Sequence, residues 1–155
     1  MRPLIHKISA ILALCLIASF WVATVISEIF LDPPQITLVK TLIPYGFLLL
    51  IPALALTGAT GMQMGRRAKT GPVLAKRKRM PFIAANGILV LVPVALILAV
   101  KARQGQFDSV FYLLQGVELL FGAINLCLIG LNIRDGRRIT AARHPNTEKP
   151  RQIEI

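Results

Sequence analysis

The sequence predicts an all-α fold, a four-helix transmembrane bundle with both chain termini in the cytoplasm. Three observations lead to this prediction. Of the 155 residues, 55% are hydrophobic and 16% are charged, whereas about 25% of the residues of an average soluble domain are charged. The hydrophobic residues form four runs, each long enough to cross a membrane. Most Lys and Arg residues lie next to those ends of the runs that would be at the same side of the membrane.

The four runs are predicted to be helices because a chain in lipid must satisfy its backbone hydrogen bonds within each segment. In chain order they are Ile8–Leu31, Ile36–Thr60, Phe82–Val100 and Ser109–Ile133. The shortest would be about 28 Å long, close to the thickness of the hydrocarbon core of a bilayer. The first run is longer than the core of a secretory signal and no small-residue cleavage site follows it, so we expect a retained span.

The links between the runs predict how the helices pair. Asp32–Gln35 and Lys101–Asp108 are short, which favours antiparallel packing of the first helix with the second and of the third with the fourth. They leave almost no extracytoplasmic domain, which argues against a receptor. Residues 1–138 are predicted to form a single four-span domain, and residues 139–155 a flexible, polar cytoplasmic tail.

The 18 Lys and Arg residues predict the orientation. Fifteen of them precede the first run, lie between the second and third, or follow the fourth, whereas only Lys101 and Arg103 lie at the opposite side. The positive-inside rule therefore places both termini and the central loop in the cytoplasm. This distribution is typical of a bacterial inner membrane, and an organelle membrane is the alternative.

The densest basic run consists of Lys76, Arg77, Lys78 and Arg79. Our main interpretation is that these residues fix the topology, and the alternative is that they bind anionic lipid headgroups at the cytoplasmic face. Nucleic acid is not an expected partner, because the basic residues follow the membrane edges without aromatic residues between them.

The fourth run carries two stripes at close to heptad spacing. The polar stripe consists of Gln115, Glu118, Gly122, Asn125 and Asn132. The small-residue stripe beside it consists of Gly116, Ala123 and Gly130. Small residues let helix backbones approach closely and polar residues bond across the contact, so Gly122 and the small-residue stripe are predicted packing positions. We expect the fourth helix to lie in the middle of the bundle, with Leu113 and Leu120 facing lipid.

Glu118 is the centre of a predicted intramembrane polar cluster with Gln115, Asn125, Lys40 and Glu28. It would lie about 15 Å from the outer edge of its span, where an isolated carboxylate is costly. One interpretation is a proton or cation relay. The other is a hydrogen-bonded clamp between helices that holds a neutral glutamic acid.

Lys40 is the one basic residue inside a predicted span. Because side chains lean toward the N-terminal end of their helix, we expect Lys40 to extend outward, to Glu28 or to water. Contact with Glu118 would require the second helix to bend inward, which Pro44 and Pro52 permit. Gly61 and Gly65, at the end of the same run, are interpreted as a helix stop, with helix dimerisation as the alternative.

Neither a metal nor a cofactor is expected. The two histidines, His6 and His144, lie outside the hydrophobic runs. The predicted helices therefore contain no histidine that could bind the iron of a haem. No cluster of metal-ligating residues, phosphate-binding loop or catalytic motif occurs in the sequence. Cys15 and Cys127 are interpreted as small apolar fillers, with a redox pair as the alternative.

The leading functional hypothesis is therefore an integral membrane protein without catalytic chemistry, an accessory or assembly subunit. Its partners would be the bilayer and either another membrane protein or further copies of itself. The alternative is a small oligomeric transporter, coupled to protons or cations, that uses Glu118. A membrane enzyme is the least favoured of the three.

Overall fold

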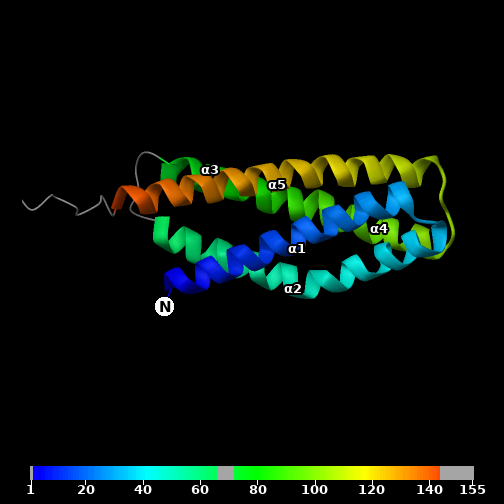
Figure 1. The fold of residues 1–155 in the computed structure, drawn as a ribbon, viewed down its shortest axis with the longest axis horizontal. Coiled ribbons are helices and arrows are strands. Elements are labelled where there is room, and N and C mark those ends of the chain that lie inside the picture. Colours follow the sequence, from blue (N-terminus) through cyan, green and yellow to red (C-terminus); the bar gives the residue numbers. More distant parts are fainter. Residues whose placement is uncertain (1, 66–71, 144–155) are drawn as a thin grey trace, which may run out of the picture.

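The computed structural model describes the backbone of residues 2–65 and 72–143 and the side chains of residues 4–63 and 78–135. In this part of the chain every regular element is helical. The elements are α1 (Arg2–Phe30), α2 (Pro33–Gly65), α3 (Pro72–Ala85), the π-helical segment η1 (Asn86–Leu91), α4 (Val92–Arg103) and α5 (Ser109–Arg143). Because α3, η1 and α4 follow one another as one rod, the bundle has four rods (Figure 1).

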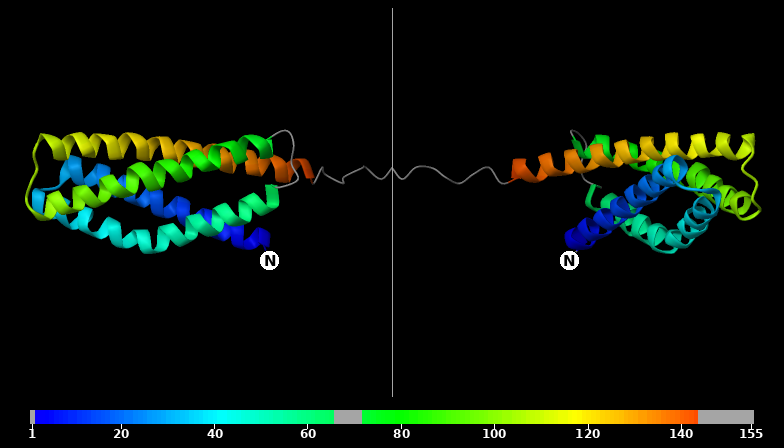
Figure 2. Two further views of the ribbon diagram at one scale, coloured as in Figure 1. Left: turned by 180° about the vertical axis from the view of Figure 1, so that it is seen from behind. Right: turned by 45° about the vertical axis from the view of Figure 1, so that its right-hand side comes forward.

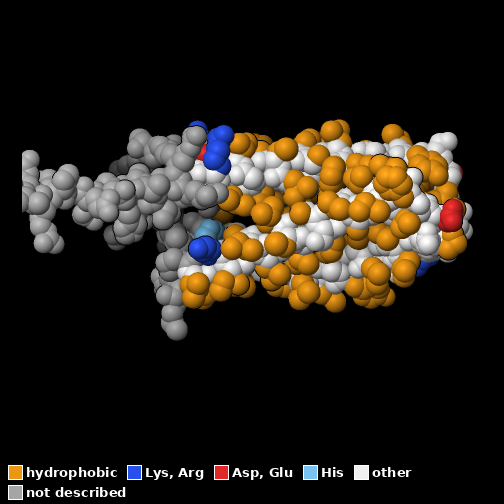
Figure 3. All heavy atoms as spheres, in the orientation of Figure 1, with side chains coloured by type: hydrophobic (Ala, Val, Ile, Leu, Met, Phe, Trp, Pro, Cys, Tyr) orange, Lys and Arg blue, Asp and Glu red, His pale blue; other side chains and the backbone are white. Residues whose placement is uncertain are grey.

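Four helical stretches of the described chain are long and apolar enough to cross a membrane. They are Leu4–Phe30, Pro33–Gln63, Lys78–Arg103 and Ser109–Asp135. These stretches confirm the four predicted helices and extend most of their ends by a few residues. In Figure 3 hydrophobic side chains cover the length of the bundle, whereas charged side chains gather at its two ends. Leu113 and Leu120 are 69% and 60% exposed, as expected for side chains that face lipid.

Two short turns at one end of the bundle make two antiparallel hairpins (Figures 1 and 2). Leu31 and Asp32 join α1 to α2, and residues 104–108 join α4 to α5. We call this the turn end, and the opposite end, where α1 begins, the terminal end. The α1–α2 turn is shorter than expected because Pro33 already begins α2, where its missing N–H costs nothing. Gly105 has a φ of 68°, which glycine adopts without strain.

Asp108 caps the start of α5. Its carboxylate accepts a hydrogen bond from the backbone N–H of Phe111 at 2.8 Å and one from the Lys101 ammonium at 2.9 Å. The hydrogen bond from the Phe111 N–H lowers the pKa of the Asp108 carboxyl below its ordinary value, and the hydrogen bond from Lys101 lowers it further. The cap is therefore fully formed at neutral pH and is lost only as the pH falls through this lowered pKa.

Two apolar clusters hold the hairpins together. Near the turn end, Ile36 of α2 packs with Leu98 of α4 and Phe111 of α5, and the last two side chains are fully buried. Toward the terminal end, Ile17 of α1 packs with Leu50 of α2. Thus α2 packs on α4 with its first half and on α1 with its second half, and it bends in between (Figures 1 and 2).

The bend in α2 coincides with its two internal prolines, Pro44 and Pro52. A proline inside a helix removes one hydrogen bond and clashes with the preceding turn, so it is a common cause of a kink. The rod of α3, η1 and α4 is also irregular. In η1 the Val92 N–H donates to the Gly87 carbonyl, one residue further back than in an α-helix.

Asn86, at the start of η1, donates a hydrogen bond to the Phe121 carbonyl of α5 at 2.9 Å. This contact ties the irregular part of the rod to α5. The third run was expected to begin at Phe82, but α3 begins ten residues earlier, at Pro72, so Pro81 lies inside the helix. At the other end of the bundle α5 continues to Arg143, so the beginning of the expected tail is helical; residues 144–155 lie outside the described residues.

The predicted packing glycines of α5 differ in their surroundings. Gly122 faces α1, where a Cβ atom added to it would lie 2.8 Å from Cδ1 of Trp21. Trp21 in turn donates a hydrogen bond from Nε1 to the Leu119 carbonyl at 3.0 Å. By contrast, a Cβ atom added at Gly116 or Gly130 meets nothing within 4 Å. Gly122 therefore lies at a contact between α5 and α1, whereas Gly116 and Gly130 are exposed.

We predict that Gly122→Ala destabilises the bundle and that Gly116→Ala does not. The added methyl at position 122 must displace the Trp21 ring, at a cost of about 1–3 kcal/mol. At position 116 alanine relieves the entropic cost of a helical glycine and should stabilise by up to about 1 kcal/mol. The free energy of unfolding by sodium dodecyl sulfate in mixed micelles measures both changes. Equal effects of the two substitutions would contradict the contact between α1 and α5.

Candidate functional site

The site is built on a buried ion pair between α2 and α5. Lys40 Nζ lies 2.6 Å from Glu118 Oε2 and donates a hydrogen bond to it. The Lys40 side chain is 1% exposed and the Glu118 side chain 12% exposed. Lys40 is the eighth residue of α2 and Glu118 the tenth of α5, which places Glu118 about 15 Å along its helix from the turn end.

Glu28 of α1 is the third charged residue of the site. It lies close enough to Lys40 and Glu118 to interact with both charges. Its Oε1 atom is buried and has no hydrogen-bond partner among the described residues. We call Glu28, Lys40 and Glu118 the charge cluster. When all three groups are ionised the charge cluster has one negative charge in excess, which is costly in a surrounding of low dielectric constant.

The expected direction of Lys40 is therefore wrong. The sequence predicts an outward path to Glu28 or water, whereas the Lys40 ammonium is bonded to Glu118. The first half of α2 packs directly on α4 and the start of α5, and the bend at the prolines allows this approach. The packing of this first half of α2 thus brings Lys40 to Glu118.

The polar stripe of α5 faces the interior of the bundle, as predicted. Gln115, Asn125 and Asn132 are 4%, 2% and 7% exposed. Both polar side-chain atoms of Gln115 and Oδ1 of each asparagine are buried without a hydrogen-bond partner among the described residues. Buried polar atoms without partners are costly, and in native proteins they mark places that hold water, an ion or a ligand.

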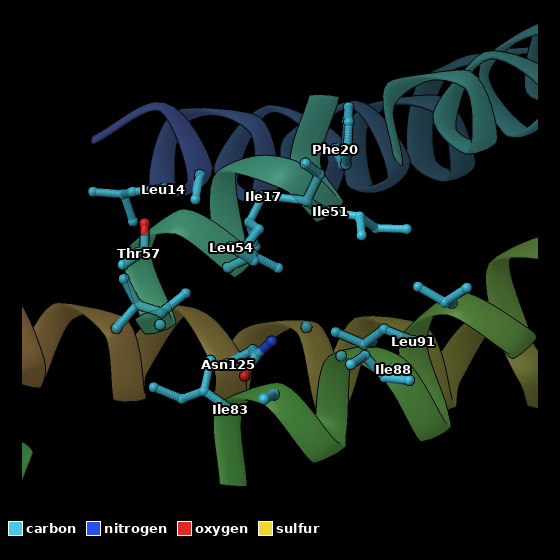
Figure 4. Close-up of a pocket in the computed structure, with 18 of the residues that line it drawn as sticks. Leu14, Ile17, Phe20, Ile51, Leu54, Thr57, Ile83, Ile88, Leu91 and Asn125 are labelled. Carbon is cyan, nitrogen blue, oxygen red and sulfur yellow. The ribbon is translucent and has the colours of Figure 1, made fainter. Parts of the chain in front are cut away.

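A cavity of about 470 Å³ separates the two hairpins. Leu14, Ile17 and Phe20 of α1 and Ile51 and Leu54 of α2 line one wall (Figure 4). The facing wall contains Ile83 of α3, Ile88 and Leu91 of η1, and Asn125 of α5 (Figure 4). Glu118 lines the same cavity, so one member of the charge cluster is in contact with this space.

Polar groups at the end of the cavity away from Glu118 were not predicted. His6 Nδ1 lies 3.0 Å from Thr60 Oγ1 and 3.2 Å from the Thr57 carbonyl. The Thr57 hydroxyl lies 3.0 Å from Oγ of the buried Ser9. These contacts join residues about 50 positions apart in the chain, so no local pattern in the sequence predicts them. His6 and Thr57 also line the cavity, which gives it a polar group at each end.

The basic run lies outside the charge cluster. Arg79 donates a hydrogen bond to Asp135 of α5 at 2.7 Å, so it connects two helices as well as contributing charge at the membrane edge. Lys78 is exposed, and the side chains of Lys76 and Arg77 lie outside the described residues. Cys15 and Cys127 are both exposed and unbonded, so they do not form a pair.

The described side chains contain no group of three His, Cys, Asp or Glu residues placed to hold a metal ion. The chain matches no family model, and neither the curated proteins nor the solved structures compared with it yield a match. The charge cluster and the cavity are therefore the features of this chain that bear on its function.

We predict that Lys40 and Glu118 are strongly coupled in stability. Lys40→Met leaves Glu118 without its main partner, and Glu118→Gln leaves Lys40 without its own, each at a cost of about 3–5 kcal/mol. The double variant should cost much less than the sum of the two, because neither member of the pair is left without its partner. Unfolding of the four proteins in mixed micelles gives the coupling. Additive effects would rule out the ion pair. The matched cycle uses Lys101→Met and Asp108→Asn at an exposed pair, where the coupling should be much weaker.

Proposed function

We propose that the chain is a multi-pass protein of a bacterial inner membrane with both termini in the cytoplasm. Four apolar helices of sufficient length support a membrane location. The orientation is supported by the distribution of Lys and Arg, which gather at the terminal end and in the loop between α2 and α3. The turn end would then face away from the cytoplasm.

Within that membrane we propose that the protein transports protons or another small cation through Glu118. The observation that carries this proposal is the Lys40–Glu118 ion pair at the edge of an internal cavity. An ionisable residue inside a membrane span is costly and is a functional candidate for that reason. A helix clamp would be served equally well by neutral amides, without the desolvation of three charged groups.

The charge cluster would hold one ion at a time. One ammonium cannot neutralise two carboxylates, so a proton or a cation is needed to balance Glu28 and Glu118. In the arrangement described, Lys40 neutralises Glu118 and the additional ion resides with Glu28. If Glu118 takes up a proton from the cavity, Lys40 is free to neutralise Glu28 instead, and the ion held at Glu28 is released toward the turn end. The change of partner by Lys40 would thus move one positive charge between the cavity and the turn end.

A second candidate is an accessory or assembly subunit, and one observation favours it. The small-residue stripe of α5 has Gly116 and Gly130 facing outward with no neighbour within 4 Å of an added Cβ. Small residues on an outer helix face allow another helix to approach closely. The same face would serve an oligomeric transporter, since four spans are few for a transporter that works alone. Transport by the purified chain without other proteins distinguishes the two candidates.

We predict that vesicles containing the purified chain take up protons or alkali cations when a gradient and a membrane potential are imposed. Glu118→Gln should reduce this flux to the level of protein-free vesicles, because the variant lacks the group that binds the ion. Fluorescence of a pH-sensitive or cation-sensitive dye inside the vesicles measures the flux. Asp108→Asn, which removes an exposed carboxylate at the turn end, is the control and should leave the flux unchanged.

Two outcomes would overturn the transport proposal. Flux that persists in Glu118→Gln would exclude Glu118 as the carrier. Absence of flux in a correctly inserted wild-type protein would leave the accessory subunit as the better interpretation. Glu118→Gln leaves the Lys40 ammonium without its partner, so the double variant Lys40→Gln/Glu118→Gln is measured in parallel. The double variant has no unpaired ammonium and should also be inactive.

A further inference from the structure

We infer that the internal cavity is a binding site for a lipophilic monovalent cation, an apolar molecule with one delocalised or amine positive charge. The inference names a substrate class for the proposed transporter, and in that sense it rests on the proposed function. It is carried by three features of the cavity: the sign of the charge that it contains, its apolar walls and its opening.

The charge that faces the cavity is negative. Glu118 lines the cavity and its side chain is 12% exposed, whereas Lys40 is 1% exposed and is not among the residues that line it. The ammonium therefore lies behind the carboxylate as seen from the cavity. Glu28 adds a second carboxylate within electrostatic range of Glu118. A cationic ligand in the cavity thus meets the Glu118 carboxylate, and no lysine or arginine is among the described residues that line the cavity.

The walls of the cavity select an apolar ligand body. Most of the lining side chains are aliphatic, and Phe20, Phe47 and Trp21 add aromatic surface. Phe20 and Phe47 pack edge to face, with ring centroids 6.2 Å apart. Aromatic rings attract cations through their π faces, which is more effective where water is excluded. The cavity volume of about 470 Å³ lies within the usual range of small-molecule sites, roughly 300–1,000 Å³.

The cavity opens toward the position that lipid would occupy. Ile51 of α2 and Ile88 of η1 line it from opposite walls (Figure 4) and are 52% and 64% exposed. Within the described residues α2 and η1 do not contact each other, although α2 contacts both α3 and α4 on either side of η1. This gap beside the π-helical segment allows an apolar molecule to enter from the bilayer rather than from water.

The experiment uses the purified chain in detergent and its single tryptophan. Trp21 lines the cavity, so its fluorescence reports on ligands placed there. The probes are tetraphenylphosphonium and tetraphenylborate, which have nearly the same shape and opposite charge. We expect the phosphonium to change Trp21 emission saturably and to bind at least about tenfold more tightly than the borate, because only the cation gains from Glu118.

Variants test the residues that carry the inference. Glu118→Gln should weaken phosphonium binding by at least about tenfold and leave borate binding nearly unchanged. Asp108→Asn, at the turn end, should change neither. Ala13→Phe places a phenyl group against the cavity wall and should weaken phosphonium binding while keeping the ion pair intact, which provides a test if Glu118→Gln fails to fold.

Equal affinity for the two probes, or phosphonium binding that is unaffected by both Glu118→Gln and Ala13→Phe, would overturn the inference. Its failure is distinct from a failure of the transport proposal. Glu118-dependent binding without flux in vesicles would keep the cation site and remove transport. Glu118-dependent flux without phosphonium binding would remove the cation site and keep transport of a smaller ion.

Discussion

The structure depends on how three charged side chains are kept within an apolar bundle. A lysine that is 1% exposed cannot be left unpaired, and its one direct hydrogen-bond partner among the described residues is Glu118. Removing charges from water costs several kcal/mol per ion. The 2.6 Å contact between Lys40 and Glu118 offsets this cost only if α2 and α5 keep a fixed position relative to each other. The ion pair therefore constrains the helices as much as the helices position the ion pair.

The packing around the ion pair follows from this constraint. The first half of α2 lies against α4 and the start of α5, where Leu98 and Phe111 are fully buried. Beyond Pro44 the helix turns to α1, so the two hairpins separate and the cavity lies between them. The irregular turn of η1 lies on the opposite wall, and π-helical turns occur frequently at functional sites. The ion pair, the bend in α2 and the cavity are thus adjacent. Glu118 belongs to two of them, because it bonds to Lys40 and also lines the cavity.

Much of the bundle could be predicted from the sequence because lipid imposes strong rules. Hydropathy located the four spans, and the spacing of Gln115, Glu118 and Asn125 placed them on the inner face of α5. The partner of Lys40 could not be predicted, since it depends on how the first half of α2 packs on α4 and α5. Likewise the sequence could not distinguish Gly122 from Gly116, because only the position of Trp21 decides which glycine is in contact. The cavity, the pairing of His6 with Thr60 and the π-helical turn arise from contacts between distant residues, which leave no periodic signal.

The central claim is that Lys40 and Glu118 form an ion pair in the lipid-embedded bundle, and solid-state nuclear magnetic resonance on the protein in bilayers tests it directly. With ¹⁵N-labelled lysine and ¹³C-labelled glutamate, dipolar recoupling measures the distance from the Lys40 Nζ atom to the Glu118 carboxyl carbon. We predict strong coupling between these two nuclei, as a contact of 2.6 Å between Nζ and Oε2 requires, and its loss in Glu118→Gln. Coupling of Lys40 to Glu28 alone, or to no carboxylate, would contradict the account.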